Sequence, residues 1–112
     1  MTTQAELTVQ EKEAYVRARW IDVYDDGYSV RLLSPIKGWI ETPKFSGVSN
    51  RWPECYAFTI DRERQIAEVE EEVNLVRGEI RFFQGSPRAK GAMERILTRL
   101  QQVLAELRRG MR

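Results

Sequence analysis

Apolar residues recur every three or four positions through much of the second half of the chain. The first series is Ile66, Val69, Val73, Val76, Ile80 and Phe83. This spacing places the whole series on one stripe of a helix, as in the seam of a coiled coil. The same phase extends back to Trp52, so the pattern predicts a helix over residues 51–84, with Ser49 or Asn50 as its N-cap.

The letters QGSPRAK predict a break after this helix, because glycine favours helix ends, serine caps helices and proline suits a first turn. Apolar residues then return at the same spacing: Met93, Ile96, Leu100, Val103, Leu107 and Met111. We expect a second helix over residues 87–110, antiparallel to the first because the connection is short. Leu97 and Leu104 widen its stripe beyond what one partner helix covers, which suggests a homodimer.

The charges favour the same pairing of helices. Residues 61–81 hold seven acidic and four basic side chains, whereas residues 88–112 hold seven basic and two acidic ones. Exposed ion pairs contribute only about 0.2–1 kcal/mol each, so these charges select orientation more than they stabilise the fold. Glu70, Glu71 and Glu72 point in directions about 100° apart, so we interpret this run as a solvated helix surface and expect no metal site there.

The sequence of the first third of the chain is compatible with two structures, a long helix or a shorter helix followed by a β-hairpin. Thr8 and Glu11 match a capping box, which is typical of a helix start. Apolar residues follow at helical spacing: Val9, Val16, Trp20 and Val23. The pair Asp26-Gly27 lies between alternating apolar residues, which indicates a β-hairpin instead. We favour a helix over residues 8–26 that is capped by Gly27, with the hairpin as its chief alternative.

Residues 27–50 show no helical period, and Pro35 and Pro43 interrupt their extended runs. Short strands are expected at residues 28–33 and 38–41. Irregular segments of this length are usually functional or mobile, so we expect a partner surface here. The predicted fold is a single, mainly α domain over residues 1–112: an N-terminal helix, an irregular segment with a short β element, and a long antiparallel α-helical hairpin that resembles a coiled coil.

The amino-acid composition limits the classes of function that the chain can have. The chain has 18 Lys and Arg against 17 Asp and Glu, so its net charge of +1 gives no general attraction to nucleic acid or membranes. It has no His, which removes the commonest general base and transition-metal ligand, and Cys55 fits a small buried side chain. We expect a protein that is not an enzyme and has no cofactor or metal. The lack of an apolar leader or spanning segment predicts a cytoplasmic protein.

The candidate partner-binding residues lie in and around the irregular segment: Tyr28, Arg31, Lys37, Trp39, Lys44 and Phe45. In the stretch PIKGWIETPKF an aromatic residue lies between basic ones, a mixture suited to a protein hot spot or to stacking on a base. The main hypothesis is therefore a protein-binding module.

Two other functions stay open. In the first, Tyr28, Arg31, Lys37 and Trp39 stack on and neutralise an anionic ring compound, so that the protein sequesters a nucleotide or another small ligand. In the second, the basic last helix binds nucleic acid; its candidate residues are Arg88, Arg95 and Arg99. The second function is disfavoured because Glu106 interrupts the same flank.

Three stretches resemble small proteins encoded by bacteriophages and prophages: AYVRARW (14–20), CYAFTIDRERQIAEVEEEV (55–73) and RILTRLQQVLAELRRGM (95–111). The resemblance covers most of the chain except residues 27–48. It implies a phage accessory protein in the cytoplasm of a bacterial host, and it brings no activity, cofactor or binding residue with it. Proteins of that setting often bind and disable a host factor, so the resemblance implies a module that binds and modulates a host defence protein.

Overall fold

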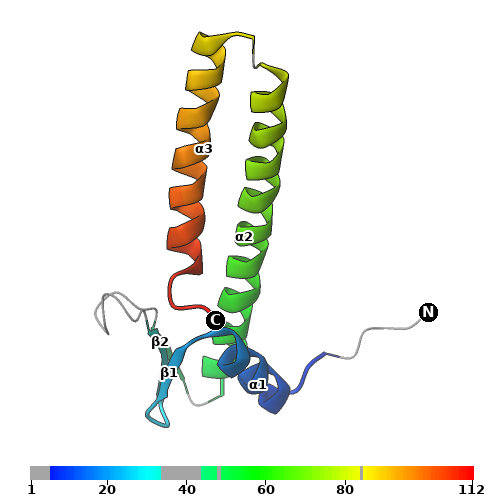
Figure 1. Ribbon diagram of the computed structural model, residues 1–112. Coiled ribbons are helices and arrows are strands. Elements are labelled where there is room, and N and C mark those ends of the chain that lie inside the picture. Colours follow the sequence, from blue (N-terminus) through cyan, green and yellow to red (C-terminus); the bar gives the residue numbers. More distant parts are fainter. Residues whose placement is uncertain (1–5, 34–43, 48, 84) are drawn as a thin grey trace, which may run out of the picture. The chain divides into compact units, whose positions relative to one another are not determined.

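The computed structural model describes residues 6–33, 44–47, 49–83 and 85–112. In these ranges the chain forms three helices and one three-stranded antiparallel sheet, and it is mainly helical (Figure 1). The elements in order are α1 (Val9–Arg19), β1 (Asp22–Asp25), β2 (Ser29–Leu33), β3 (Lys44–Ser46), α2 (Arg51–Phe82) and α3 (Pro87–Arg108). They divide into a first compact unit, residues 1–61 with 109–112, and a second, residues 62–108. The expectation of a single domain stays a prediction.

The predicted helix over residues 8–26 is wrong in its second half. α1 ends at Arg19, and Trp20 is already extended, with φ −109° and ψ 142°. β1 follows and pairs antiparallel with β2, so the hairpin alternative is the one that the structure adopts. The physical reason is that pairing places Val23 opposite Leu32, on the face that packs against the core, which a continued helix cannot do.

The start of α1 agrees with the capping-box prediction. The Thr8 hydroxyl accepts a 3.1 Å hydrogen bond from the Glu11 backbone N–H, and the Glu11 carboxylate accepts one of 3.0 Å from the Thr8 N–H. Both contacts are exposed, and they satisfy two N–H groups that the first helical turn leaves without partners. The hydrogen bonds that Glu11 accepts, chiefly the one from the Thr8 backbone, lower the pKa of its carboxyl.

The sheet is completed by β3, which pairs with β2 through Val30 opposite Phe45. The expected strand over residues 28–33 is confirmed by β2, and the one over 38–41 lies outside the described residues. One contact is not anticipated by the sequence pattern. The Ile21 N–H donates 2.9 Å to the Gly110 carbonyl, and Trp20 forms a β-bridge with Met111, so the chain's last residues pair with the segment after α1.

Side chains of α1, α2 and the sheet form the core of the first unit. Its buried members are Val16, Trp20, Val30, Leu32, Trp52 and Cys55. Half-buried Tyr56 and Phe58 of α2 and Phe45 of β3 pack against them, and Trp20 stacks on Phe58 with ring centroids 6.1 Å apart. Met111 also packs here, so its predicted place in the seam of the last helix is wrong.

The second unit is a helical hairpin formed by α3 and the part of α2 from Arg62 onward (Figure 1). The Arg62 guanidinium donates 3.2 Å to the Leu107 carbonyl, and Arg108 forms a 3.0 Å ion pair with Glu70. Early residues of one helix thus meet late residues of the other, which confirms the predicted antiparallel arrangement. The helix bounds agree with the predicted 51–84 and 87–110 to within two residues at each end.

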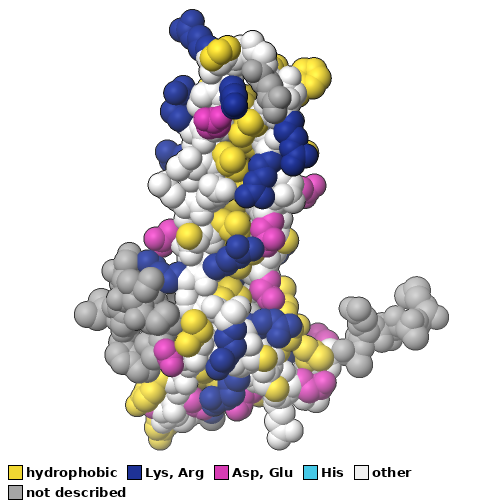
Figure 2. All heavy atoms as spheres, in the orientation of Figure 1, with side chains coloured by type: hydrophobic (Ala, Val, Ile, Leu, Met, Phe, Trp, Pro, Cys, Tyr) yellow, Lys and Arg dark blue, Asp and Glu magenta, His cyan; other side chains and the backbone are white. Residues whose placement is uncertain are grey.

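The apolar stripe on α2 is the predicted one, with Val73 buried and its neighbours in the series half-buried. Figure 2 shows hydrophobic side chains along the length of the helical hairpin. The stripe on α3 is rotated from the prediction. Leu97 and Leu104, predicted as the margin, are half-buried, whereas Ile96 and Val103, predicted in the centre, are 44% and 41% exposed. The reason is that four apolar positions in about two turns of α3, Ile96, Leu97, Leu100 and Val103, define a stripe wider than one helix can cover.

Candidate partner-binding surface

The outer face of the sheet carries a row of three side chains, one from each strand. Tyr24 of β1 pairs with Arg31 of β2, which in turn pairs with Lys44 of β3. Because paired residues point to the same face and neighbours along a strand alternate, this row faces away from the core-facing pairs that contain Val30 and Leu32. We call Tyr24, Arg31 and Lys44 the outer row. Tyr24 is 49% exposed, Lys44 is exposed and Arg31 is half-buried.

The tip of the β1–β2 hairpin lies next to this row and exposes Tyr28, whose side chain is 75% accessible. Asp26 fixes the backbone of the tip. Its carboxylate accepts hydrogen bonds of 2.9 Å from the Tyr28 N–H, 2.7 Å from the Ser29 N–H and 3.0 Å from the Ser29 hydroxyl. These bonds, the one from the Ser29 backbone first, lower the pKa of the exposed Asp26 carboxyl. Tyr28 is therefore presented on an ordered turn.

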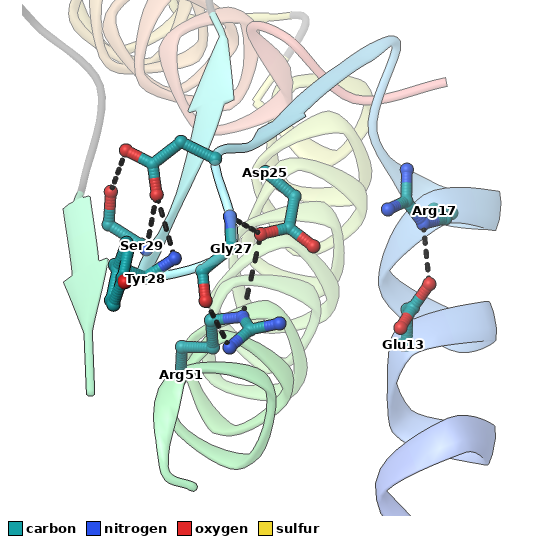
Figure 3. Close-up of polar contacts among 8 residues, drawn as sticks. Glu13, Arg17, Asp25, Gly27, Tyr28, Ser29 and Arg51 are labelled. Carbon is teal, nitrogen blue, oxygen red and sulfur yellow. Dashed lines mark hydrogen bonds and ion pairs between the residues drawn. The ribbon is translucent and has the colours of Figure 1, made fainter. Parts of the chain in front are cut away.

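Arg51, the first residue of α2, holds the other side of the tip (Figure 3). Its guanidinium donates 2.9 Å to the Gly27 carbonyl, and its Nε lies 3.5 Å from the Asp25 carboxylate, which also accepts a 2.9 Å hydrogen bond from the Gly27 N–H. Gly27 has a φ of +92°, a conformation that other residues rarely adopt. Arg51 thus anchors a turn whose geometry requires glycine.

The structure separates the six predicted partner-binding residues into three groups. Tyr28 lies at the exposed tip of the β1–β2 hairpin, and Arg31 and Lys44 lie on the outer face of the sheet. Phe45 is half-buried on the opposite face, where its ring lies 5.5 Å from that of Phe58, so it supports the sheet from within. Lys37 and Trp39 lie outside the described residues.

Tyr24 belongs to this surface, although the sequence pattern does not indicate it. In the predicted helix over residues 8–26 it would share no face with Arg31. The Asp-Gly turn was the signal that could have found it, since the hairpin register that this turn sets pairs the two residues.

The basic residues of the last helix belong to the second unit. Arg88, Arg95 and Arg99 are all exposed on α3, and their spacing of seven and four positions places them on one flank. Glu106, seven positions after Arg99, is also exposed and lies on the same flank, so negative charge interrupts the basic flank.

A groove of about 390 Å³ lies between the helices of the second unit. The ion pair of Glu70 and Arg108 borders it, and Val73 and Leu104 form its apolar floor. Glu71 and Glu72, the rest of the acidic run, are exposed. No group of three or more potential metal ligands occurs in the described ranges.

Cys55 is fully buried in the core of the first unit. Burial raises the pKa of its thiol to about 12, because the thiolate would lose its solvation there. A thiol that stays protonated near neutral pH is a poor nucleophile, because the thiolate is the reactive form. The raised pKa therefore agrees with the predicted role of Cys55 as a small buried side chain.

Searches against protein-family models, curated proteins and solved structures found no match to this chain. Of the helices that the structure describes, none combines the length and apolarity needed to span a membrane.

Proposed function

We propose that this chain is a non-enzymatic protein-binding module, encoded by a phage or prophage, that modulates a host defence protein in the bacterial cytoplasm. The observation that carries the proposal is the outer row beside the exposed Tyr28: two aromatic and two basic side chains presented together on the three-stranded sheet and the tip of its β1–β2 hairpin. The phage setting rests on the sequence resemblance alone.

Physical chemistry supports this surface as a binding site in two ways. Tyr and Arg are the residue types that contribute most to protein interfaces, because each combines a large contact area with polar groups. The hairpin tip is already fixed by Asp26 and Arg51, so little conformational entropy is lost when a partner binds it. The adjacent positive charges of Arg31 and Lys44 favour a partner with an acidic surface.

The experiment is affinity capture from host lysate, with matched variants of the full chain. Tyr28→Ala and Lys44→Glu change exposed side chains of the proposed surface, and each should reduce recovery of the same host protein at least ~10-fold. The control Arg95→Glu makes the same kind of charge reversal on the exposed flank of α3 and should leave recovery unchanged. If Arg95→Glu lowers recovery of the host protein and neither Tyr28→Ala nor Lys44→Glu does, the binding site belongs to the second unit instead.

Nucleotide sequestration is a second candidate, favoured by the cross-strand pairing of Tyr24 with Arg31. An aromatic ring beside a guanidinium can stack on a base while the cation neutralises phosphate. Titration of the full chain with nucleotides and cyclic dinucleotides, followed by intrinsic fluorescence, tests this function. A saturable change that is lost in Tyr24→Leu supports it, and a flat response removes it.

Nucleic-acid binding through Arg88, Arg95 and Arg99 is supported by their common exposed flank. It predicts an affinity that falls steeply with salt and is lost in Arg95→Glu/Arg99→Glu, whereas Lys44→Glu should have a smaller effect. Binding that does not respond to salt would exclude this function.

A further inference from the structure

The outer edge of β1 carries backbone groups without partners. In an antiparallel pair of strands, the N–H and C=O groups of successive residues point to alternate sides. The Asp26 N–H donates 3.1 Å to the Ser29 carbonyl, so Asp26 and every second residue before it face β2. Val23 and Asp25 therefore direct their backbone groups to the other side, and β1 is the first strand of the sheet. Within the ranges that the structure describes, these groups make no hydrogen bond.

The chain just before this edge already pairs with an added segment. The Ile21 N–H donates 2.9 Å to the Gly110 carbonyl, and residues 110–112 run antiparallel to residues 19–21. Because Ile21 is two positions before Val23, its backbone groups face the same side. Residues 110–112 show that this side of the chain accepts an extended segment, and they leave the edge free from Val23 onward.

A hollow of about 250 Å³ lies beside the first residues of this edge. Ile21, Asp22 and Val23 line it, together with Arg17 of α1 and Arg112. Both arginines are held in place, Arg17 by an ion pair within α1 and Arg112 by hydrogen bonds to backbone carbonyls. The hollow gives the side chains of a further segment room beside the edge.

Carboxylates follow one another along the free edge: Asp22, Asp25 and Asp26. Two of them are close to cations, since Asp22 shares the hollow with the two arginines and the Asp25 carboxylate lies 3.5 Å from Nε of Arg51 (Figure 3). Asp26 is exposed and makes no ion pair with a described residue, and the charge of Lys44 acts on it only from the far strand β3. An added basic side chain is therefore favoured at the Asp26 end of the edge.

We propose that an extended segment of the partner protein pairs antiparallel with the free edge of β1 and adds a fourth strand to the sheet. The backbone selects this occupant, because an extended polypeptide offers N–H and C=O groups in step with those of Val23 and Asp25. That the segment belongs to a partner protein rests on the proposed function. The residue opposite Tyr24 lengthens the outer row by one side chain.

The side chains of the edge define the sequence of the segment. An aromatic or β-branched residue is preferred opposite Tyr24, because cross-strand pairs of these types stabilise a sheet. In antiparallel pairing the residue two positions earlier in the segment is opposite Asp26, where lysine or arginine is favoured. The expected pattern is a basic residue, any residue, and then an aromatic or β-branched one.

A second copy of this chain fits the edge poorly. Two β1 strands related by a two-fold axis pair antiparallel, and their free groups can bond with Val23 opposite Asp25 or with Asp25 opposite itself. The first register opposes Asp22 to Asp26, and the second opposes two Asp25 carboxylates; like charges directly opposite each other are destabilising. A register with Val23 opposite itself requires the backbone of Ile21, which is already paired. The charges therefore favour a different chain.

A synthetic probe tests the edge without the partner. It is an acetylated and amidated peptide of lysine, threonine, isoleucine, valine and threonine, in that order, so that lysine falls opposite Asp26 and isoleucine opposite Tyr24. In nuclear magnetic resonance titrations of the full chain we expect saturable shifts of the Val23 and Asp25 amide signals, with a dissociation constant of about 1 mM. At saturation these two amides should exchange with solvent at least ~5-fold more slowly.

The matched control is the same peptide with N-methyl groups on its valine and its first threonine. These two residues fall opposite Val23 and Asp25, so the control keeps every side chain and loses the N–H groups that the edge carbonyls accept. It should cause no saturable shift. Equal binding of the methylated peptide, shifts that spare Val23 and Asp25, or no saturable shift of any amide up to about 10 mM probe would each overturn the proposal.

Full chains with one added backbone methyl group test the same edge with the host protein. They are assembled by ligation at Cys55, the single cysteine of the chain. N-methylation of Val23 should reduce both probe affinity and recovery of the host protein at least ~10-fold, with unchanged helicity by circular dichroism. N-methylation of Ser46, whose N–H points outward at the opposite edge of the sheet, is the control and should change neither.

The results separate this proposal from the proposed function. Recovery of the host protein that is lost in Tyr28→Ala and Lys44→Glu but unaffected by N-methylation of Val23 would overturn the edge site and leave the proposed function intact. Probe binding at Val23 and Asp25, in a chain that captures no host protein, would support the edge site and remove the proposed function.

Discussion

The indole N–H of Trp20 donates a 2.9 Å hydrogen bond to the hydroxyl of Thr59, 39 residues away in the sequence. The same hydroxyl donates 2.8 Å to the carbonyl of Cys55. Both side chains are buried, Trp20 to 4% and Thr59 to 0% exposure. This pair joins the residue directly after α1 to the first turns of α2, and it provides partners for the buried Trp20 N–H and Thr59 hydroxyl in the core of the first unit.

Replacing Thr59 by Val should destabilise the first unit by about 1–3 kcal/mol, because the buried Trp20 N–H loses its acceptor. Thr59→Ser is the matched control; it keeps the hydroxyl, loses one methyl group and should cost about 1 kcal/mol. Urea unfolding followed by tryptophan fluorescence measures both, since Trp20 and Trp52 lie in the core of the first unit. Equal losses in the two variants would mean that the hydrogen bond contributes little.

Replacing Gly27 and Gly78 by alanine should change the free energy of unfolding in opposite directions. Gly27 has a φ of +92°, so Gly27→Ala should lower stability by roughly 1–2 kcal/mol. Gly78 is inside α2 and a methyl group there would meet nothing within 4 Å, so Gly78→Ala should raise stability by about 0.5–1 kcal/mol. Thermal unfolding by circular dichroism, with fluorescence for the first unit, checks both signs. A stable Gly27→Ala protein would contradict the turn geometry.

The Asp26 carboxylate should make the stability of the hairpin depend on pH in the acid range. Hydrogen bonds from Ser29 and Tyr28 lower its pKa in the folded state below the ordinary 3.8, so its contribution is present above that value and is lost as pH falls through the lower folded pKa. Urea midpoints measured from neutral pH to about pH 2 should therefore fall more steeply in the natural chain than in Asp26→Asn. Parallel curves for the two proteins would show that the turn does not favour the charged form.

Cys55 should be inert in the folded protein. Its pKa of about 12 leaves almost no thiolate near neutral pH, and its burial excludes reagents. Iodoacetamide should modify it in denaturant only, whereas Cys55→Ala/Ala57→Cys, which moves the thiol to an exposed position of α2, should react in the native state. Between about pH 9 and pH 12 the natural chain should also lose stability, because only the unfolded thiol ionises there. Rapid native labelling of Cys55 would contradict the described core.

The helical hairpin was predictable because its signal is periodic over many residues. The apolar series from Ile66 to Phe83 has helical spacing throughout, so it predicts both the helix and the face of the helix that packs against α3. The alternating pattern of a β-strand does not occur over the same residues. The end of α1 was not predictable in the same way. Val16, Trp20 and Val23 have helical spacing, yet pairing with Leu32, nine positions later in the next strand, decides the conformation of Val23. Tertiary pairing overrode local periodicity there.

The candidate surface was partly predictable for related reasons. The composition of residues 28–45 indicated that Tyr28, Arg31 and Lys44 belong to a surface, but which of their neighbours face outward depends on strand register. That register places Tyr24 in the outer row and turns Phe45 inward. The anchoring of Gly27 by Arg51, across 24 positions, has no sequence signal at all.

Site-specific photo-cross-linking in the bacterial host tests the central claim most directly. A photoreactive residue replaces Tyr28 in one protein and Leu75, an exposed apolar residue of the second unit, in another. The binding proposal predicts one cross-linked host protein from position 28, absent from position 75, and weakened when Lys44→Glu is added. A product from position 75 alone, or one from position 28 that is unaffected by Lys44→Glu, would contradict the assignment of the binding surface to the outer face of the sheet.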